Sequence, residues 1–365
     1  MHNLLFGHFV HLDFGIAIQV VVIGFIGGVL SGFIGSGGAF FMTPGMMNLG
    51  VPGVVAVGSN ITHKFGKAMM GSRRHGKYGN VDKRLSVYMV ATSFIGIRLA
   101  VWINSALFRE GGDGHGAGGS AGSNLYISLV FILILSVVAA SMLRDAMKGG
   151  GVEKAPSMKI ANFLATLHLP PYIDFKVADV RVSLWIVLIA GLATGYLAGT
   201  IGVGGFIGVP AMIYLFGVAT PVAAGSELYL AQFMGAWGAV NYAYQGFVDL
   251  RLTMLLFLGS LIGIFMGAYG VKVVKEVVIR LVTAILILLC VLSRLIAVPM
   301  YLRQLELISM NPDWDTYFNL ASKVMLYAAG ISGVLIILYN VMKGYRQRRR
   351  IQTTLLAVRE QTAAI

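Results

Sequence analysis

The chain has 365 residues, of which 57% are hydrophobic and only 12% are charged. Soluble domains carry about a quarter charged residues, so this composition excludes a soluble globular protein and indicates one that spans a membrane many times. The net charge of +13 does not indicate nucleic-acid binding, because the basic residues form short clusters between apolar runs. The single cysteine, Cys290, excludes an intrachain disulfide and a cysteine metal cluster.

The first apolar stretch, 16–50, is interrupted by a glycine-rich run. The piece after the interruption has only about a dozen residues, too few to cross a bilayer core of about 30 Å. We therefore predict a re-entrant helical hairpin that enters and leaves on one side, and the similarly broken stretch 182–218 predicts a second. Seven further apolar runs are long enough to cross, namely 53–77, 85–107, 125–146, 220–245, 251–271, 277–299 and 322–343.

Basic residues mark one side of this arrangement. Clusters of lysine and arginine lie at 73–84, 144–181, 272–280 and 343–350, whereas the links 108–124, 246–250 and 300–321 are poor in positive charge. With both hairpins counted as non-crossing, all four basic clusters fall on one side of the membrane. Cytoplasmic loops carry an excess of lysine and arginine, so we expect a multi-pass protein of the cell membrane with its N-terminus outside and its C-terminus in the cytoplasm.

An internal duplication divides the chain. The run IGSGGAFFMTP at 34–44 matches IGVGGFIGVP at 201–210, and GNVDKRL at 79–85 matches GFVDLRL at 246–252. A constant separation of 167 residues relates Gly38 to Gly205, Ser59 to Ser226 and Asp82 to Asp249. Three full crossings lie between equivalent points, so the two copies have opposite orientations. Inverted repeats with broken helices are typical of secondary transporters, whose substrate sites lie near the midplane where the repeats meet.

The predicted fold class is all-α: a polytopic membrane protein with an inverted repeat, two broken hairpins and about seven full spans. Its parts are an external N-terminal segment 1–15, a first transmembrane repeat 16–146, a cytoplasmic connection 147–181, a second transmembrane repeat 182–299, an external loop with an additional helix 300–343, and a basic cytoplasmic tail 344–365. Within the connection, the apolar residues between Met158 and Leu167 fit either a short interfacial helix or an ordinary linker.

The two glycine breaks are the first candidates for a binding site. A break frees backbone N–H groups, and a half-helix that begins there directs its positive end at an anion. The breaks comprise Gly35, Ser36, Gly37 and Gly38 in the first repeat and Gly202, Val203, Gly204 and Gly205 in the second. Close helix packing is the alternative, since small residues let membrane helices approach. The symmetric placement of the breaks favours contact with substrate.

Polar residues inside two predicted spans are the second group of candidates. They are Ser59, Asn60, His63 and Lys64 in 53–77, and Ser226 and Glu227 in 220–245. Ionisable side chains at such depth are costly and face a cavity or a partner. Lys64, near the midplane, is the candidate for neutralising an anion, and Glu227 for carrying a coupling proton. A structural pair of Glu227 with Lys64 or with His63 accounts for these residues equally well, and Lys67 is expected to reach back to the cytoplasmic face.

These motifs resemble the sulfite exporter TauE/SafE family, also called the four-TMS sulfonate uptake (TSUP) family. The likeness rests on GFIGGVLSGFIGSGGAFFMTP, its repeat GLATGYLAGTIGVGGFIGVP and the G-x-V-D-x-R-L link in each half, and it covers residues 16–299. It implies an integral membrane transporter with two related halves, which moves a sulfur-containing anion such as sulfite, thiosulfate or an organosulfonate in association with the proton motive force. The run SNITHKFGK at 59–67 is more polar and basic than the family's usual run there.

The leading hypothesis is a secondary transporter rather than an enzyme, whose partners are the sulfur-containing anion, protons and the lipid bilayer. No cofactor, metal site, catalytic residue or nucleic-acid partner is predicted. In this hypothesis the glycine breaks, Ser59, Asn60 and Ser226 hydrogen-bond the anion, while Lys64 and His63 neutralise it. A non-transporting sensor or assembly protein that uses the basic tail is one alternative, and an anion channel is another.

Overall fold

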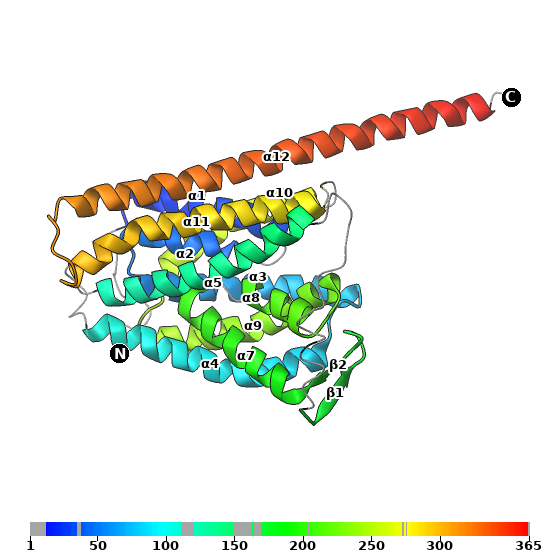
Figure 1. The fold of residues 1–365 in the computed structure, drawn as a ribbon. Coiled ribbons are helices and arrows are strands. Elements are labelled where there is room, and N and C mark those ends of the chain that lie inside the picture. Colours follow the sequence, from blue (N-terminus) through cyan, green and yellow to red (C-terminus); the bar gives the residue numbers. More distant parts are fainter. Residues whose placement is uncertain are drawn as a thin grey trace.

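The computed structural model describes residues 12–34, 38–110, 120–148, 163, 169–202, 205–271, 274 and 276–363. It is a bundle of helices with one small pair of strands (Figure 1). The helices are α1 (Phe14–Ile34), α2 (Ala39–Asn48), α3 (Gly53–Lys77), α4 (Lys83–Glu110), α5 (Ala121–Lys148), α7 (Leu184–Ile201), α8 (Gly205–Pro210), α9 (Thr220–Tyr244), α10 (Leu250–Val271), α11 (Glu276–Gln304) and α12 (Trp314–Ala363). The prediction of an all-α membrane protein is confirmed, since seven of the described helices have the length and hydropathy of a span.

Two of these seven spans differ from the predicted set. The seven are α1, α4, α5, α7, α10, α11 and α12, so α1 and α7, the first arms of the hairpins, replace α3 and α9. The latter two helices have 25 residues each, a length of about 37 Å at about 1.5 Å per residue. Their central polar side chains lower the hydropathy, and the structure buries these side chains inside the bundle.

The first glycine break is the turn of a helical hairpin. The helix α2 runs back along α1, because Gly38 lies against Gly27 and Gly45 lies against Ile23. The helix α1 runs parallel to α10, since Gly24 lies against Leu256 and Gly28 against Ser260. The helix α3 also runs parallel to α10, since Ser59 contacts Thr253 and His63 contacts Ser260. Since α1 and α3 share a direction, α2 has to return the chain between them, as predicted.

The second break has the same role. The hydroxyl of Tyr242, near the end of α9, donates a hydrogen bond of 2.7 Å to the carbonyl of Gly199, near the end of α7. The ends of α7 and α9 therefore lie together. The chain returns between these helices through α8 and a π-helical turn, Ala211–Leu215.

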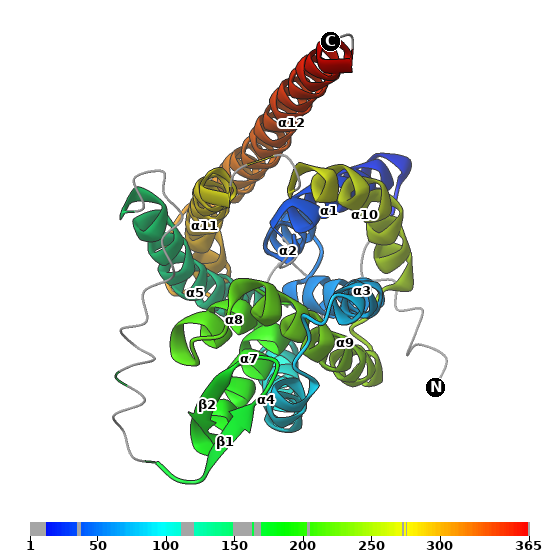
Figure 2. The same ribbon diagram turned by 90° about the vertical axis from the view of Figure 1, so that its right-hand side faces the viewer.

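The two repeats are interlocked by an exchange of helices. The helix α1 packs along α10 of the second repeat, and α7 packs along α4 of the first (Figure 2). These contacts are made by backbone: a Cβ at Gly28 would lie 2.5 Å from the carbonyl oxygen of Ser260, and one at Gly195 would lie 2.2 Å from that of Ser93. Gly28 and Gly195 are equivalent in the duplication, so the same contact is made twice.

The equivalent helices α3 and α9 cross in opposite directions at the centre. Gly238 of α9 lies against Ile61, early in α3, whereas Leu228, earlier in α9, lies against Gly71, later in α3. Equivalent helices that run antiparallel belong to repeats of opposite orientation. The structure therefore has the predicted inverted repeat.

The connection between the repeats contains a feature that the sequence did not predict. Two antiparallel strands, β1 (Tyr172–Phe175) and β2 (Val180–Ser183), pair with each other. They lie at the same end of the bundle as the projecting end of α12 (Figure 1), as expected if both segments face one side of the membrane. Apart from Phe163, the residues of the predicted interfacial helix lie outside the described residues.

Replacing Gly263 of α10 with alanine tests the interlocking contact. The added Cβ would lie 2.2 Å from the carbonyl oxygen of Phe25 and 2.7 Å from the backbone nitrogen of Val29, and backbone atoms have little room to move. We expect Gly263→Ala to lower the free energy of unfolding by about 2–3 kcal/mol, measured by thermal unfolding of the purified protein. Gly76→Ala is the control, because nothing lies within 4 Å of its Cβ position; equal midpoints for the two variants would contradict the expectation.

Candidate functional site

At the crossing, each central helix contacts the short helix of its own hairpin. On α3, the Nδ2 of Asn60 donates to the hydroxyl of Thr43 in α2 at 2.8 Å and to the carbonyl of Ala39 at 3.3 Å. The equivalent residue on α9 is Glu227, whose Cγ lies 2.7 Å from the Cβ position of Gly208 in α8. An amide in one repeat and a carboxylate in the other thus occupy equivalent places.

The end of α7 meets the first hairpin at the same place. The hydroxyl of Thr43 donates to the carbonyl of Ile201 at 3.3 Å. Gly202 follows with a φ of +75°, a backbone conformation that favours glycine, and its Cβ position lies 3.2 Å from both Asn60 Nδ2 and Thr43 Oγ1. Sequence reasoning missed Thr43, although it is the first polar side chain after the first break.

A buried ion pair joins the two crossing helices. The Nζ of Lys64 lies 3.6 Å from Oε1 of Glu227, and the two side chains are 14% and 2% exposed. Of the two pairs left open by the sequence, the structure thus forms the one with Lys64. This Oε1 accepts no hydrogen bond, so the charge of Lys64 compensates that of Glu227 across the interface of the repeats.

His63 and Lys67, which flank Lys64 on α3, turn toward the α1–α10 pair. His63 Nε2 lies 2.7 Å from the hydroxyl of Ser260 in α10, and its ring meets Phe257 edge-on. Lys67 was expected to extend toward the membrane surface; instead its Nζ donates to the hydroxyl of Ser31 in α1 at 2.7 Å. Within the described part of the chain, the ion pairs include neither of these two residues.

We call the charged side chains at the crossing, Lys64, Lys67 and Glu227, the Lys64 centre. Their charges come unequally from the two repeats. The positions in α9 equivalent to His63, Lys64 and Lys67 are held by Leu230, Ala231 and Met234. The first repeat therefore supplies the amines and the second supplies the carboxylate. With two lysines against one glutamate, the ionised centre has a surplus of one positive charge, which favours an anion.

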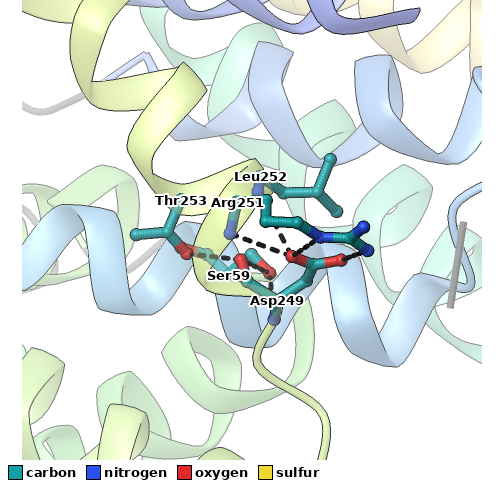
Figure 3. Close-up of polar contacts among 5 residues, drawn as sticks. All are labelled: Ser59, Asp249, Arg251, Leu252 and Thr253. Carbon is teal, nitrogen blue, oxygen red and sulfur yellow. Dashed lines mark hydrogen bonds and ion pairs between the residues drawn. The ribbon is translucent and has the colours of Figure 1, made fainter. Parts of the chain in front are cut away.

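Ser59 and Ser226 are held in a different environment. The hydroxyl of Ser59 accepts a hydrogen bond from the backbone nitrogen of Asp249 at 3.2 Å, next to the Asp249–Arg251 ion pair (Figure 3). In the other repeat, the hydroxyl of Ser226 accepts from the backbone nitrogen of Asp82 at 2.8 Å. Each serine thus attaches its helix to the G-x-V-D link of the opposite repeat, and its contact with substrate stays a prediction.

The glycine breaks are described in part. Gly35, Ser36, Gly37, Val203 and Gly204 lie outside the described residues. Gly38 has a packing reason of its own, since its Cβ position would be 1.8 Å from the carbonyl oxygen of Gly27. Gly205 is the first residue of α8.

Asp82 shows how the serine-bound links are stabilised. Its carboxylate, 2% exposed, accepts hydrogen bonds from the backbone nitrogens of Leu85, Val177 and Ala178 at 2.9–3.1 Å. It thereby joins the start of α4 to the turn between β1 and β2.

Because Asp82→Ala leaves these donors without an acceptor, we expect it to lower the free energy of unfolding by about 2–3 kcal/mol. Asp174→Ala removes the same charge from a side chain that is 75% exposed and should change stability by less than about 0.5 kcal/mol. Chemical or thermal unfolding of both variants makes the comparison, and a mild effect of Asp82→Ala, equal to that of the control, would contradict it.

Comparison with known proteins extends this picture. Residues 20–294 match the family described as Sulfite exporter TauE/SafE. Three proteins of Bacillus subtilis (strain 168) are similar to most of the chain: "Probable membrane transporter protein YdhB" is 23% identical over 72% of this chain and 93% of its own length. "Probable membrane transporter protein YjnA" is 23% identical over 69% of this chain and 89% of its own length. "Probable membrane transporter protein YunE" is 24% identical over 74% of this chain and 95% of its own length. No solved structure matches significantly.

The family match runs from α1 to Arg294 in α11, so it includes both hairpins and the α3–α9 crossing, while α12 lies beyond it. More than half of the chain is covered. The protein therefore belongs to the sulfite exporter TauE/SafE family of membrane transporters.

Proposed function

We propose that this protein is a secondary transporter that carries a small sulfur-containing anion, such as sulfite, thiosulfate or an organosulfonate, across the cell membrane in company with protons. Its N-terminus is outside and its C-terminus is in the cytoplasm. The basic clusters support this orientation, as does the position of the strand pair and the projecting end of α12 at one end of the bundle (Figure 1).

The observation that carries the proposal is the buried Lys64–Glu227 pair at the crossing of the inverted repeats. Removing one partner from a buried pair leaves an uncompensated charge, which is strongly unfavourable. Lys64 therefore needs a negative partner in every state of the protein. A bound anion meets that need as well as Glu227 does, so the anion and the carboxylate compete for one amine.

This competition couples the anion to a proton. When an anion pairs with the ammonium group of Lys64, the carboxylate of Glu227 is displaced and stays buried without a cation. Because a buried unpaired charge is unfavourable, the carboxylate binds a proton and becomes neutral. Protonation in turn raises the surplus charge of the centre from one to two, since Lys67 faces no carboxylate in the described structure. Anion binding and protonation of Glu227 therefore favour each other by linkage, as a symporter requires.

Neutral groups complete the proposed site. Asn60, Thr43 and the backbone at Gly202 lie together where the end of α7 meets the first hairpin, and we expect backbone N–H groups of the two breaks to contribute to the site as well. Rocking of the interlocked helix pairs around α3 and α9 exposes the site to one side at a time. His63, Ser59 and Ser226 make the structural hydrogen bonds described above, and their contact with the anion stays a prediction.

Counterflow of radiolabelled sulfite in proteoliposomes tests transport itself. Saturable exchange, competed by thiosulfate or a small sulfonate, is expected of a carrier. A channel gives no counterflow against an opposing gradient, and a sensor protein gives no flux. Either of these results from folded, reconstituted protein would overturn the proposal.

Lys64→Gln tests the proposed anion contact. Removing a charge-assisted contact of about 1.5–3 kcal/mol should weaken anion affinity by about 10-fold to 100-fold, read from the half-saturating concentration in counterflow. Lys83→Gln is the control, because this lysine is exposed at the start of α4. The contact is ruled out if Lys64→Gln is folded and keeps the affinity of the control.

Glu227→Gln tests proton coupling. Glutamine resembles the protonated carboxyl group, so this variant should bind thiosulfate with an affinity that does not depend on pH. In the wild type, affinity should rise as pH falls, because protonation of Glu227 frees Lys64. The charge of thiosulfate does not change over the mildly acidic to mildly alkaline range. Glu306→Gln, at an exposed position, is the control, and the same pH dependence in Glu227→Gln as in the wild type would remove Glu227 from the coupling step.

A further inference from the structure

A second buried positive charge lies outside the Lys64 centre, in α11. Arg294 is 1% exposed and falls within the span Leu281–Gln304, about 15 Å before its end at about 1.5 Å per residue. A guanidinium group stays charged in proteins, and a charge at this depth is costly unless it is compensated. None of the ion pairs among the described residues includes Arg294.

The hydrogen-bond partners of Arg294 are neutral, and they include the buried hydroxyl of Tyr301 on the same helix. Its Nη2 donates to Oδ1 of Asn48 in a short contact and to the hydroxyl of Ser322 at 2.8 Å, and Nη1 lies 3.9 Å from the sulfur of Met47. Asn48 is the last residue of α2, and Ser322 belongs to α12. The negative end of the α2 dipole amounts to only about half a charge, so it compensates Arg294 in part.

Two donors in this cluster have no acceptor. They are Nε of Arg294 and Nδ2 of Asn48, both fully enclosed. The hydroxyl oxygen of Ser322 does not serve them, since it accepts from Nη2 of Arg294, and its single proton points to Asn48 Oδ1 or to the carbonyl of Ser293. Uncompensated charge and unpaired N–H groups therefore occur on the same two neighbouring side chains, and a single negatively charged acceptor would satisfy both.

We propose that Arg294 and Asn48 bind one small inorganic anion of the halide class where α2, α11 and α12 meet. This site is distinct from the Lys64 centre, which adjoins the other end of α2, where Asn60 contacts Ala39. It does not depend on the proposed transport function. The bound anion joins the end of α2 to α11 and to α12, the helix that lies beyond the family match.

Bromide-dependent thermal unfolding of the full-length protein tests this site, with bromide exchanged for gluconate at constant ionic strength. Bromide should raise the midpoint of the wild type by several degrees and leave that of Arg294→Gln unchanged. Arg303→Gln is the matched control: this arginine of the same helix is already paired with Asp315 at 2.5 Å, so the variant should keep the response to bromide. Lys64→Gln should also keep it, which separates this site from the transport centre.

Asn48→Asp provides a second test that does not remove the arginine. The new carboxylate pairs with Arg294 inside the protein, so the variant should fold and its midpoint should no longer depend on bromide. The proposal is overturned if bromide stabilises Arg294→Gln or Asn48→Asp as much as the wild type, or if the wild type shows no response. Anomalous scattering from wild-type crystals grown in bromide decides the location: a peak within hydrogen-bonding reach of Arg294 Nε supports the site, and no peak there overturns it.

Discussion

Close backbone contact between helices of different repeats is the constraint on which the rest of this bundle depends. In a membrane, lipid tails are as apolar as leucine, so helices associate through van der Waals packing and hydrogen bonds rather than through the hydrophobic effect. The glycines of α1, α7 and α10 let carbonyl groups of the partner helix approach to distances that a Cβ would prevent. Because the partners come from opposite repeats, each repeat needs the other to cover its first helix.

The interlocked pairs determine what lies between them. They place α3 and α9 across the centre, where protein surrounds the polar side chains of these two helices. The described residues of the two hairpin breaks lie there as well, and irregular backbone at membrane depth is tolerated only inside protein or along a watery cavity. Within this duplicated frame the charges are not duplicated: the enclosed part of α3 carries Lys64 and Lys67, and that of α9 carries Glu227. In the proposed mechanism, the symmetry of the frame allows alternating access, and the asymmetry of the charges favours binding of an anion and a proton.

Much of this architecture can be predicted from the sequence, because duplication leaves a constant residue separation and a glycine break in a long apolar stretch indicates a helical hairpin. The hairpins, the inverted orientation and the family were predicted in this way, and the pairing of Lys64 with Glu227 was one of two alternatives. The spans were assigned less accurately, since hydropathy reports contact with lipid rather than length. The hydropathy of the helices therefore favours α1 and α7 as spans over α3 and α9, whose polar side chains are enclosed by other helices.

Contacts across the repeats were harder to predict. Ser59 and Ser226 were predicted to contact substrate, and nothing in the sequence indicated that they also accept hydrogen bonds from backbone groups of the opposite repeat. Thr43, Ser31 and Arg294 were not among the predicted site residues, because the hydrogen bonds that make each of them notable are formed with a helix distant in the chain. Short-range patterns do not contain that information, which depends on how α1, α7, α10 and α12 pack.

The most direct test of the central claim is to locate a bound substrate analogue. Selenite resembles sulfite and contains an anomalous scatterer, so crystals of the full-length protein grown with selenite report where the anion binds. The proposed mechanism predicts a selenium peak beside Lys64 Nζ, between α2, α3 and α9, and its loss in Lys64→Gln. A peak elsewhere in the bundle with none at Lys64, or one that persists in that variant, would contradict the assignment of Lys64 and Glu227 as the transport centre.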